Sequence, residues 1–91
     1  MKTKLLKSID SFVSALFTFG KVGQAQFVRT NFPKIVEGIW ADDKSDSDNI
    51  KNVEDQFIFN KNLNQFQGNT IVSQCIDAFL EGWFVDVKKM L

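Results

Sequence analysis

Apolar residues recur every three or four positions through four stretches of this chain, and that spacing constrains its fold more than any other feature. It places the apolar side chains on one face of an α-helix. The four stretches are residues 3–19, 24–41, 48–66 and 69–90. A helix with one apolar face must bury that face against other elements. We therefore predict a single all-α domain over residues 1–91, folded as a small four-helix bundle.

A short motif occurs twice in the chain. Residues 36–44 read Val-Glu-Gly-Ile-Trp-Ala-Asp-Asp-Lys, and residues 80–88 read Leu-Glu-Gly-Trp-Phe-Val-Asp-Val-Lys, an offset of 44. At this offset the apolar positions of residues 1–44 align with those of residues 45–88, as two pseudo-repeated helical hairpins would require. Because 44 residues is close to a whole number of helical turns, two unrelated helix pairs would align almost as well. Duplication and coincidence both fit the pattern.

The repeated motif predicts two similar helix ends, each with a glycine before large apolar residues. These glycines are Gly38 and Gly82. Glycine within a helical pattern costs about 1 kcal/mol relative to alanine. Either a close approach of two backbones or a fraying helix end would explain that cost.

Residues that interrupt the helical pattern divide the chain. Residues 42–49 are all polar or charged and form the clearest linker, with Ser47 or Asn49 as the expected cap of the next helix. Gly20 is expected to end the first helix. Pro33 falls inside the second stretch and disfavours helical dihedrals in the residue before it, so we expect a break or kink near residues 30–32. Asparagines leave residues 57–68 open between helix and strand.

Composition argues against several kinds of chemistry. The chain has eleven basic and eleven acidic residues, one Arg and no His or Tyr. Nucleic-acid-binding proteins usually carry a basic excess, so a nucleic-acid partner is not expected. Without His the common acid–base and Cys–His pairs are impossible, and the sequence has no phosphate-binding loop, serine elbow or zinc motif. We expect neither enzymatic activity nor a cofactor or metal.

Cys75 is the only cysteine, and it falls on the apolar stripe of the last predicted helix. We expect it to behave as a small buried hydrophobe. One unpaired cysteine fits a reducing cytoplasm, where we expect the protein to reside. Residues 1–7 resemble the charged start of a signal peptide, but Asp10 interrupts the apolar region behind them. No apolar run approaches the roughly 20 residues of a membrane span.

Residues 43–54 resemble the twelve-residue calcium loop of an EF-hand. Oxygen-bearing side chains stand at its first, third, fifth and seventh positions, and Glu54 stands at its twelfth. Asp48 replaces the glycine that forms the sharp turn of such loops, and Ser45 and Ser47 replace stronger ligands. The resemblance implies a calcium-binding protein as one alternative function, and the other interpretation is an acidic, solvated linker.

The aromatic residues carry the main functional prediction. Ten Phe and two Trp are more rings than the helical stripes of a small domain can bury. Phe17, Phe19, Phe59 and Phe66 do not all fit one buried face, and neither Ile39-Trp40 nor Trp83-Phe84 fits a narrow stripe. Exposed aromatic residues are typical of protein contact sites. We predict that Trp40, Phe59, Trp83 and Phe84 contact a partner.

The favoured function is therefore a small, non-catalytic protein-binding module, such as an inhibitor, adaptor, immunity-type protein or assembly subunit. The partner is another protein or a second copy of the chain. The N-terminal helix supports an alternative, since Lys2, Lys4, Lys7 and Lys21 flank its apolar face as in helices that lie on anionic membranes. We favour a core role for this helix, because its removal would leave the other stripes uncovered.

Overall fold

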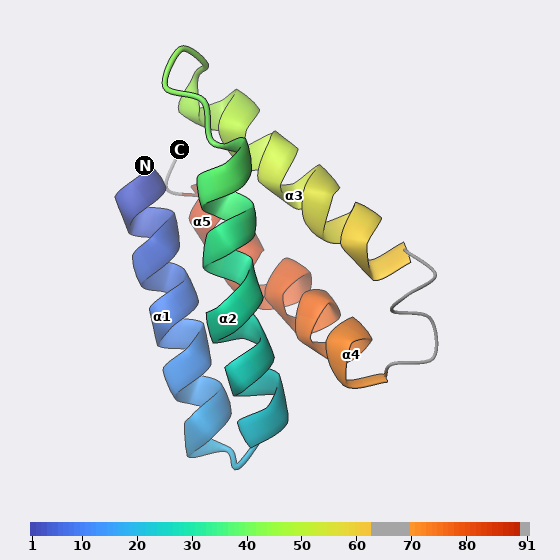
Figure 1. Ribbon diagram of the computed structural model, residues 1–91. Helices are drawn as coiled ribbons and strands as arrows, with labels where there is room; N and C mark the ends of the chain where they lie inside the picture. Colours follow the sequence, from blue (N-terminus) through green and yellow to red (C-terminus); the bar gives the residue numbers. More distant parts are fainter. Residues whose placement is uncertain (63–69, 90–91) are drawn as a thin grey trace.

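The computed structural model describes the backbone of residues 1–62 and 70–89, and every regular element in these ranges is helical (Figure 1). The elements are α1 (Lys2–Thr18), α2 (Val22–Ile39), α3 (Asp46–Asn62), α4 (Thr70–Ala78), a π-helical turn (Phe79–Trp83) and α5 (Phe84–Lys89). Because α4, the π turn and α5 follow one another directly, the described chain contains four helical segments. The predicted all-α bundle is confirmed.

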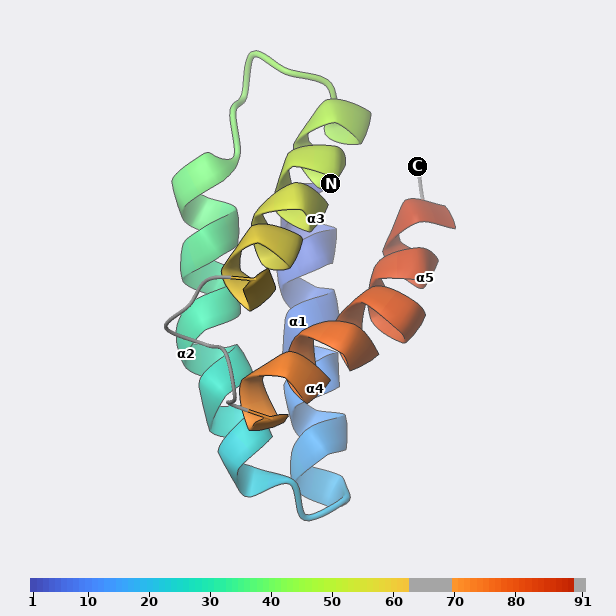
Figure 2. The same ribbon diagram turned by 90° about the vertical axis from the view of Figure 1, so that its right-hand side faces the viewer.

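The helices form two layers. Helices α1 and α2 lie side by side as an antiparallel hairpin, and α3 and the α4–α5 segment pack against one side of it (Figures 1 and 2). The α1–α2 turn lies at one end of the molecule, and the connection from α2 to α3 lies at the other. Each layer therefore covers the apolar face of the other, as amphipathic helices require.

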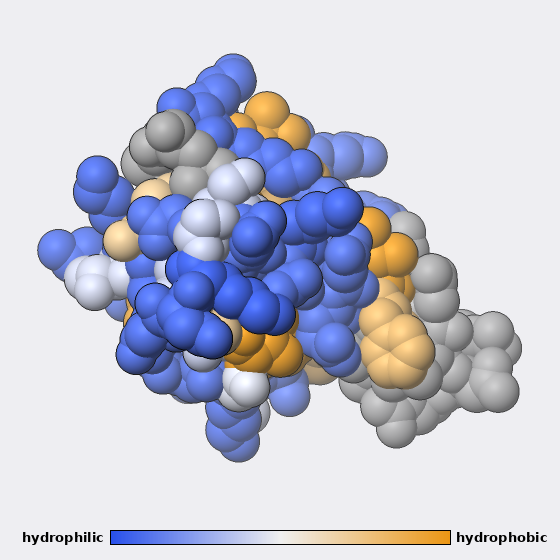
Figure 3. Space-filling model, turned by 90° about the horizontal axis from the view of Figure 1, so that it is seen from above, coloured by the Kyte–Doolittle hydropathy of each residue, from blue (hydrophilic) through white to orange (hydrophobic). Residues whose placement is uncertain are grey.

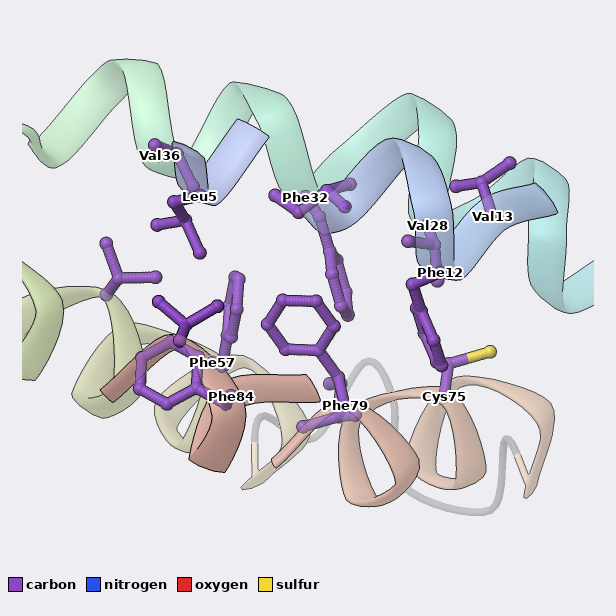
Figure 4. Packing of buried hydrophobic residues seen from close by; sticks show 14 of the residues in the cluster. Leu5, Phe12, Val13, Val28, Phe32, Val36, Phe57, Cys75, Phe79 and Phe84 are labelled. Atoms are coloured by element: carbon purple, nitrogen blue, oxygen red, sulfur yellow. The ribbon is translucent and has the colours of Figure 1, made fainter. Parts of the chain in front are cut away.

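The core between the layers is built around phenylalanine. Phe79 lies at its centre, with its ring edge-on to the rings of Phe12, Phe32 and Phe57 at centroid distances of 5.1–5.4 Å (Figure 4). Phe32 and Phe57 stack at 4.5 Å and join α2 to α3. Such pairs stabilise a fold beyond the area that they bury. The buried set draws on every helix: Leu5, Ile9, Phe12, Val13, Leu16, Ala25, Val28, Phe32, Val36, Ile50, Val53, Phe57, Cys75, Ile76, Phe79, Phe84 and Val87.

The α1–α2 turn is closed by a Schellman motif. Gly20 has a φ of 74°, a conformation that glycine adopts without steric cost. The Lys21 amide donates to the Leu16 carbonyl at 2.8 Å, and the Gly20 amide donates to the Phe17 carbonyl at 3.0 Å. These two bonds satisfy carbonyls that the end of α1 would otherwise leave free. Gly20 ends the first helix as predicted.

Helix α2 runs through Pro33 without interruption, so the break that was one alternative near residues 30–32 is wrong, and the other alternative, a kink, stays a prediction. Proline has no amide hydrogen, and the carbonyl of Arg29 therefore lacks its usual partner one turn later. Arg29 is exposed, which leaves water free to bond that carbonyl. Val28, Phe32 and Val36 are buried on both sides of the proline, and this packing holds the helix together.

The connection from α2 to α3 is shorter than the predicted linker, because residues 46–49 are helical. Ser45 caps α3 instead of Ser47 or Asn49: its Oγ accepts a hydrogen bond from the Asp48 amide at 3.1 Å. Asn49 is 1% exposed and bonds back to the connection. Its Oδ1 accepts from the Ala41 amide at 2.9 Å, and its Nδ2 donates to the Ala41 carbonyl at 2.8 Å. Asn49 therefore fixes the path of the connection.

The two copies of the Glu-Gly-aromatic motif have different structures. In the first copy α2 ends at Ile39, and Trp40 is extended, with a ψ of 126°. In the second copy the motif lies in the π turn, where the helix continues and the Phe84 amide donates to the Phe79 carbonyl five residues earlier. The prediction of two similar helix ends is therefore wrong. A Cβ added at Gly38 or Gly82 would meet no atom within 4 Å, so a close backbone approach does not explain either glycine.

Candidate functional site

An apolar hollow lined by described residues opens between α2, α3 and α4. It has a volume of about 270 Å³. The buried rings of Phe32 and Phe57 and the buried side chain of Ile76 line it from three different helices. Its lining therefore depends on how α2, α3 and α4 pack together, which makes the hollow a product of the tertiary fold.

The α2 side of this hollow is formed by Phe27, Asn31 and Ile35, which recur every four residues beside the buried stripe. All three are half-buried. The Asn31 Nδ2 donates to the Phe27 carbonyl at 2.9 Å, which occupies one of its hydrogens within the helix. Lys34 adds an exposed ammonium group at the edge. The hollow thus offers apolar contact over most of its wall, with one amide and one positive charge beside it.

Six large apolar side chains of the described residues stand exposed at the surface. Ile58 and Phe59 lie near the end of α3, and Phe59 is 56% exposed. Phe17, Phe19 and Val22 gather at the α1–α2 turn, where Phe19 is 78% exposed, and Val85 lies on α5. The face at the opposite end from that turn is mainly hydrophilic, with apolar atoms in small areas (Figure 3). Exposed apolar side chains therefore concentrate at two places, the end of α3 and the α1–α2 turn.

The four residues predicted to contact a partner have different surroundings. Phe59 is exposed, as that prediction requires. Trp40 is half-buried and packs against the core at the end of α2. The side chain of Trp83 lies outside the described part of the chain, as does the whole of Phe66. Of the predicted contact residues whose side chains are described, Trp40 and Phe59 lie apart, at the end of α2 and near the end of α3.

The prediction that Phe84 contacts a partner is wrong, because its side chain is fully buried. Its ring lies 5.8 Å from that of Phe79 and 6.1 Å from that of Phe57 (Figure 4). The π turn is the physical reason: it inserts one extra residue, so a side chain five positions after Phe79 returns to the buried face. Regular helical spacing would have placed that face one residue earlier, and periodicity alone cannot reveal the insertion.

Cys75 lies on the buried face of α4 beside Phe12, as the sequence predicted (Figure 4). Burial raises the pKa of the Cys75 thiol to about 11, while the positive charge of Lys21 acts in the opposite direction. A nucleophilic cysteine needs a lowered pKa and access to its substrate. The surroundings of Cys75 therefore suit a packing residue.

The calcium-loop interpretation of residues 43–54 is wrong. Residues 46–54 belong to α3, so the side chains of Ser47, Asn49 and Glu54 project from a helix and cannot converge as they do in an EF-hand loop. Asn49 uses its oxygen and amide on Ala41, and Glu54 forms an ion pair with Lys88. Nowhere in residues 1–62 and 70–89 do three Cys, Asp or Glu residues gather as a metal site would require.

The apolar face of α1 is buried in the core of the bundle. Leu5, Ile9, Phe12, Val13 and Leu16 are all buried against the other helices. This face cannot lie on a membrane while the bundle is intact. In the described chain, no helix combines the length and the hydropathy needed to cross a bilayer.

Comparisons with known proteins add no functional information: the chain matches no protein-family model, no curated protein and no solved structure. Function must therefore be argued from the surface of the fold alone.

The hollow beside α2 was not foreseen from the sequence. Phe27 and Ile35 follow the helical apolar spacing of residues 24–41, which by itself predicts burial in the core, and Asn31 is not part of that spacing. The available signal was the row of Phe27, Asn31 and Ile35 next to the buried stripe of Val28, Phe32 and Val36. A stripe wider than its partner helices can cover leaves one edge accessible.

Proposed function

We propose that this protein is a small, non-catalytic binding module of the cytoplasm that recognises another protein through the hollow beside α2 and the exposed end of α3. The observation that carries this proposal is the apolar hollow itself, walled by Phe27, Phe32, Ile35, Phe57 and Ile76. Concave apolar sites are where partner proteins insert their anchoring residues, and the exposed ring of Phe59 on α3 adds a second apolar contact.

The size and chemistry of the hollow favour a protein over a metabolite. Small-molecule sites usually span about 300–1,000 Å³ and carry several convergent polar groups. This hollow holds about 270 Å³, and among the described residues that line it only Asn31 and Lys34 are polar. That volume suits one or two apolar side chains of a partner. A helix that lays one apolar ridge along α2 would fill the hollow and leave its polar face in solvent.

The surface chemistry supports binding without catalysis. Burial raises the pKa of the Cys75 thiol, which shifts this group away from reactivity. Functional acids and bases are usually found where burial and neighbouring charges tune their pKa values in a cleft. The carboxylates Asp42, Asp43, Asp46 and Asp48 are solvated at the far end of the molecule from the α1–α2 turn.

Site-specific photo-cross-linking in the native host tests the proposal. A photoreactive phenylalanine analogue at position 59 is expected to form an adduct with one defined protein. The same analogue at Phe19, a more exposed ring at another end of the molecule, serves as the control. The purified partner should then bind the Phe59→Ser variant at least about tenfold more weakly than wild type, as for a contact worth more than 1 kcal/mol. Equal adducts from both positions, or unchanged affinity of folded Phe59→Ser, would contradict the proposal.

A closely related alternative is self-association, in which the partner is a second copy of this chain. Sedimentation of the purified chain separates the two, since a homodimer that uses the hollow would dissociate in the Ile35→Lys variant. A monomer at all concentrations points to a different protein as the partner. A dimer unaffected by Ile35→Lys and by Phe59→Ser would place the contact elsewhere.

A further inference from the structure

The α1–α2 turn carries three of the six large apolar side chains that stand exposed on the described surface. We define the tip as Phe17, Phe19, Lys21 and Val22. Phe19 is 78% exposed, and the other two apolar side chains of the tip are also exposed. A Cβ added at Gly20 or Gly23 would meet no atom within 4 Å, so no other element crowds the turn at these two positions. In Figures 1 and 2 this turn projects beyond α3 and α4.

The segment of chain that carries the tip contains charged residues of a single sign. Between Asp10 and Glu37 the chain contains no Asp or Glu, and it contains Lys21, Arg29 and Lys34. The Arg29 guanidinium lies 5.7 Å from the ring centroid of Phe17, which places a positive charge beside an exposed ring. No described residue forms an ion pair with Lys21 or Arg29. The α4 residues that share a hollow with Lys21 are neutral: Gln74, Cys75 and Ala78.

The shape and area of the tip favour a lipid surface over a protein. Full burial of three side chains of this size removes roughly 300–500 Å² from water, whereas a stable protein interface needs about 800 Å² from each partner. A projecting tip also needs a matching pocket on a protein, but the deformable headgroup region of a bilayer accepts it in any orientation. Aromatic side chains flanked by cations are favoured at that depth, because the rings enter the interface while the cations meet anionic headgroups.

From these observations we infer that the tip is a membrane-contact site that inserts Phe19 and Val22 into the headgroup region of an anionic bilayer, with Lys21 and Arg29 against its phosphates. This site is separate from the hollow beside α2 and does not depend on the proposed protein-binding function. Insertion would direct the opposite end of the molecule, with the α2–α3 connection, away from the membrane. The hollow on the side of the bundle would stay accessible to a partner.

Co-sedimentation with vesicles tests the site in the full-length chain. Wild type is expected to bind vesicles of phosphatidylcholine with 30% phosphatidylserine and not vesicles of phosphatidylcholine alone, with affinity that falls as salt is added. Phe19→Ser should weaken binding roughly tenfold or more, because burial of that ring is lost. Lys21→Gln should weaken it about fivefold, the usual effect of one cation near an anionic surface. Phe19 and Lys21 are exposed, and so are the two control positions, Phe59 and Lys44. We therefore expect all four substitutions to leave the fold intact, which circular dichroism verifies.

Two matched controls make the test specific. Phe59→Ser removes an exposed ring from α3, and Lys44→Gln removes a cation from the opposite end of the molecule. Both should bind anionic vesicles like wild type. Equal losses in the controls and in the tip variants would overturn the inference, and so would the absence of vesicle binding at low salt. If Phe19→Ser instead abolished self-association or partner binding, the tip would be a protein contact and the lipid assignment would be wrong.

A tryptophan introduced at the tip reports how deeply the tip inserts into the bilayer. Phe19→Trp should gain emission that shifts to the blue and is quenched by brominated lipids, whereas Phe59→Trp should show neither change. Quenching at position 59 and not at position 19 would place the membrane on α3 and contradict the inference. Because Phe59 belongs to the proposed protein-binding surface and Phe19 to the tip, the two variants separate failure of one proposal from failure of the other.

Discussion

At the scale of single residues, burial decides the chemistry of the one thiol. Cys75 lies among apolar side chains, and desolvation raises its pKa to about 11 from an ordinary value of 9.0. Between these pH values the unfolded chain loses the thiol proton while the folded chain keeps it. The folded state thus binds more protons, and the free energy of unfolding must fall as pH rises through this window.

We expect this loss to reach at most roughly 3 kcal/mol by pH 11, since each unit of pKa shift corresponds to about 1.4 kcal/mol. Urea unfolding between pH 8 and pH 11 measures it. Lysines also titrate in this range, so the same series on Cys75→Ala provides the reference. The difference in slope between the two proteins is the contribution of the thiol. Parallel slopes would mean that the thiol ionises as easily in the folded chain as in the unfolded one.

Single residues also show where prediction from sequence reaches its limit. The helical spacing correctly placed Phe12, Phe32, Phe57 and Phe79 in the core, because that spacing reports which side chains share a face. Asn49 was expected to cap a helix, yet it is buried and bonded to Ala41. Its partner lies in the preceding connection, and the approach of that connection to α3 is a tertiary contact that local pattern does not encode.

At the scale of elements, Gly38 and Gly20 show separately the effect of helix propensity and the effect of backbone conformation on stability. Gly38 lies in the last turn of α2 in ordinary helical conformation, and a Cβ there would meet no atom within 4 Å. Gly20 has equally open surroundings but a φ of 74°, which side chains rarely adopt. The two positions thus differ in backbone conformation alone, and they form a matched pair for substitution.

Gly38→Ala is expected to raise the free energy of unfolding by about 0.5–1 kcal/mol, because alanine restricts the unfolded chain and favours the helix. Gly20→Ala should lower it by about 1 kcal/mol, because a left-handed conformation is costly for any residue with a Cβ. Denaturant titration of both variants measures the two shifts. Changes of the same sign would show that conformation at residue 20 does not control this turn.

Helix boundaries show a further limit of prediction. The cap of α3 at Ser45 was missed, whereas the stop at Gly20 was foreseen. Pro33 and the π turn were not, because in both cases packing of flanking side chains overrides the local preference. Val28, Phe32 and Val36 hold α2 together across the proline, and Phe79 and Phe84 both reach the core only if the helix widens between them. The exposed Phe59 was foreseen, whereas the hollow required three helices to be in place.

At the scale of the whole molecule, the buried side chains of the two layers face one another, so neither layer has a core of its own. Phe57 on α3 joins them: its ring stacks on Phe32 of α2 at 4.5 Å and meets Phe79 edge-on at 5.3 Å. A duplicated pair of independent hairpins would instead have one core in each half. The observed packing therefore predicts that the two halves unfold together.

Amide hydrogen exchange tests this cooperativity directly. Phe57→Ala should cost about 3–5 kcal/mol, the usual range for truncating a buried phenylalanine. If the layers form one cooperative unit, the slowest amides of α1 and α2 must lose as much protection as those of α3 and α4, although Phe57 belongs to α3 alone. Phe59→Ala, two residues away on the same helix but exposed, should change exchange by less than about 0.5 kcal/mol everywhere. Retained protection in α1 and α2 of Phe57→Ala would mean that the first hairpin is stable without the second, and the single shared core would then not be the source of stability.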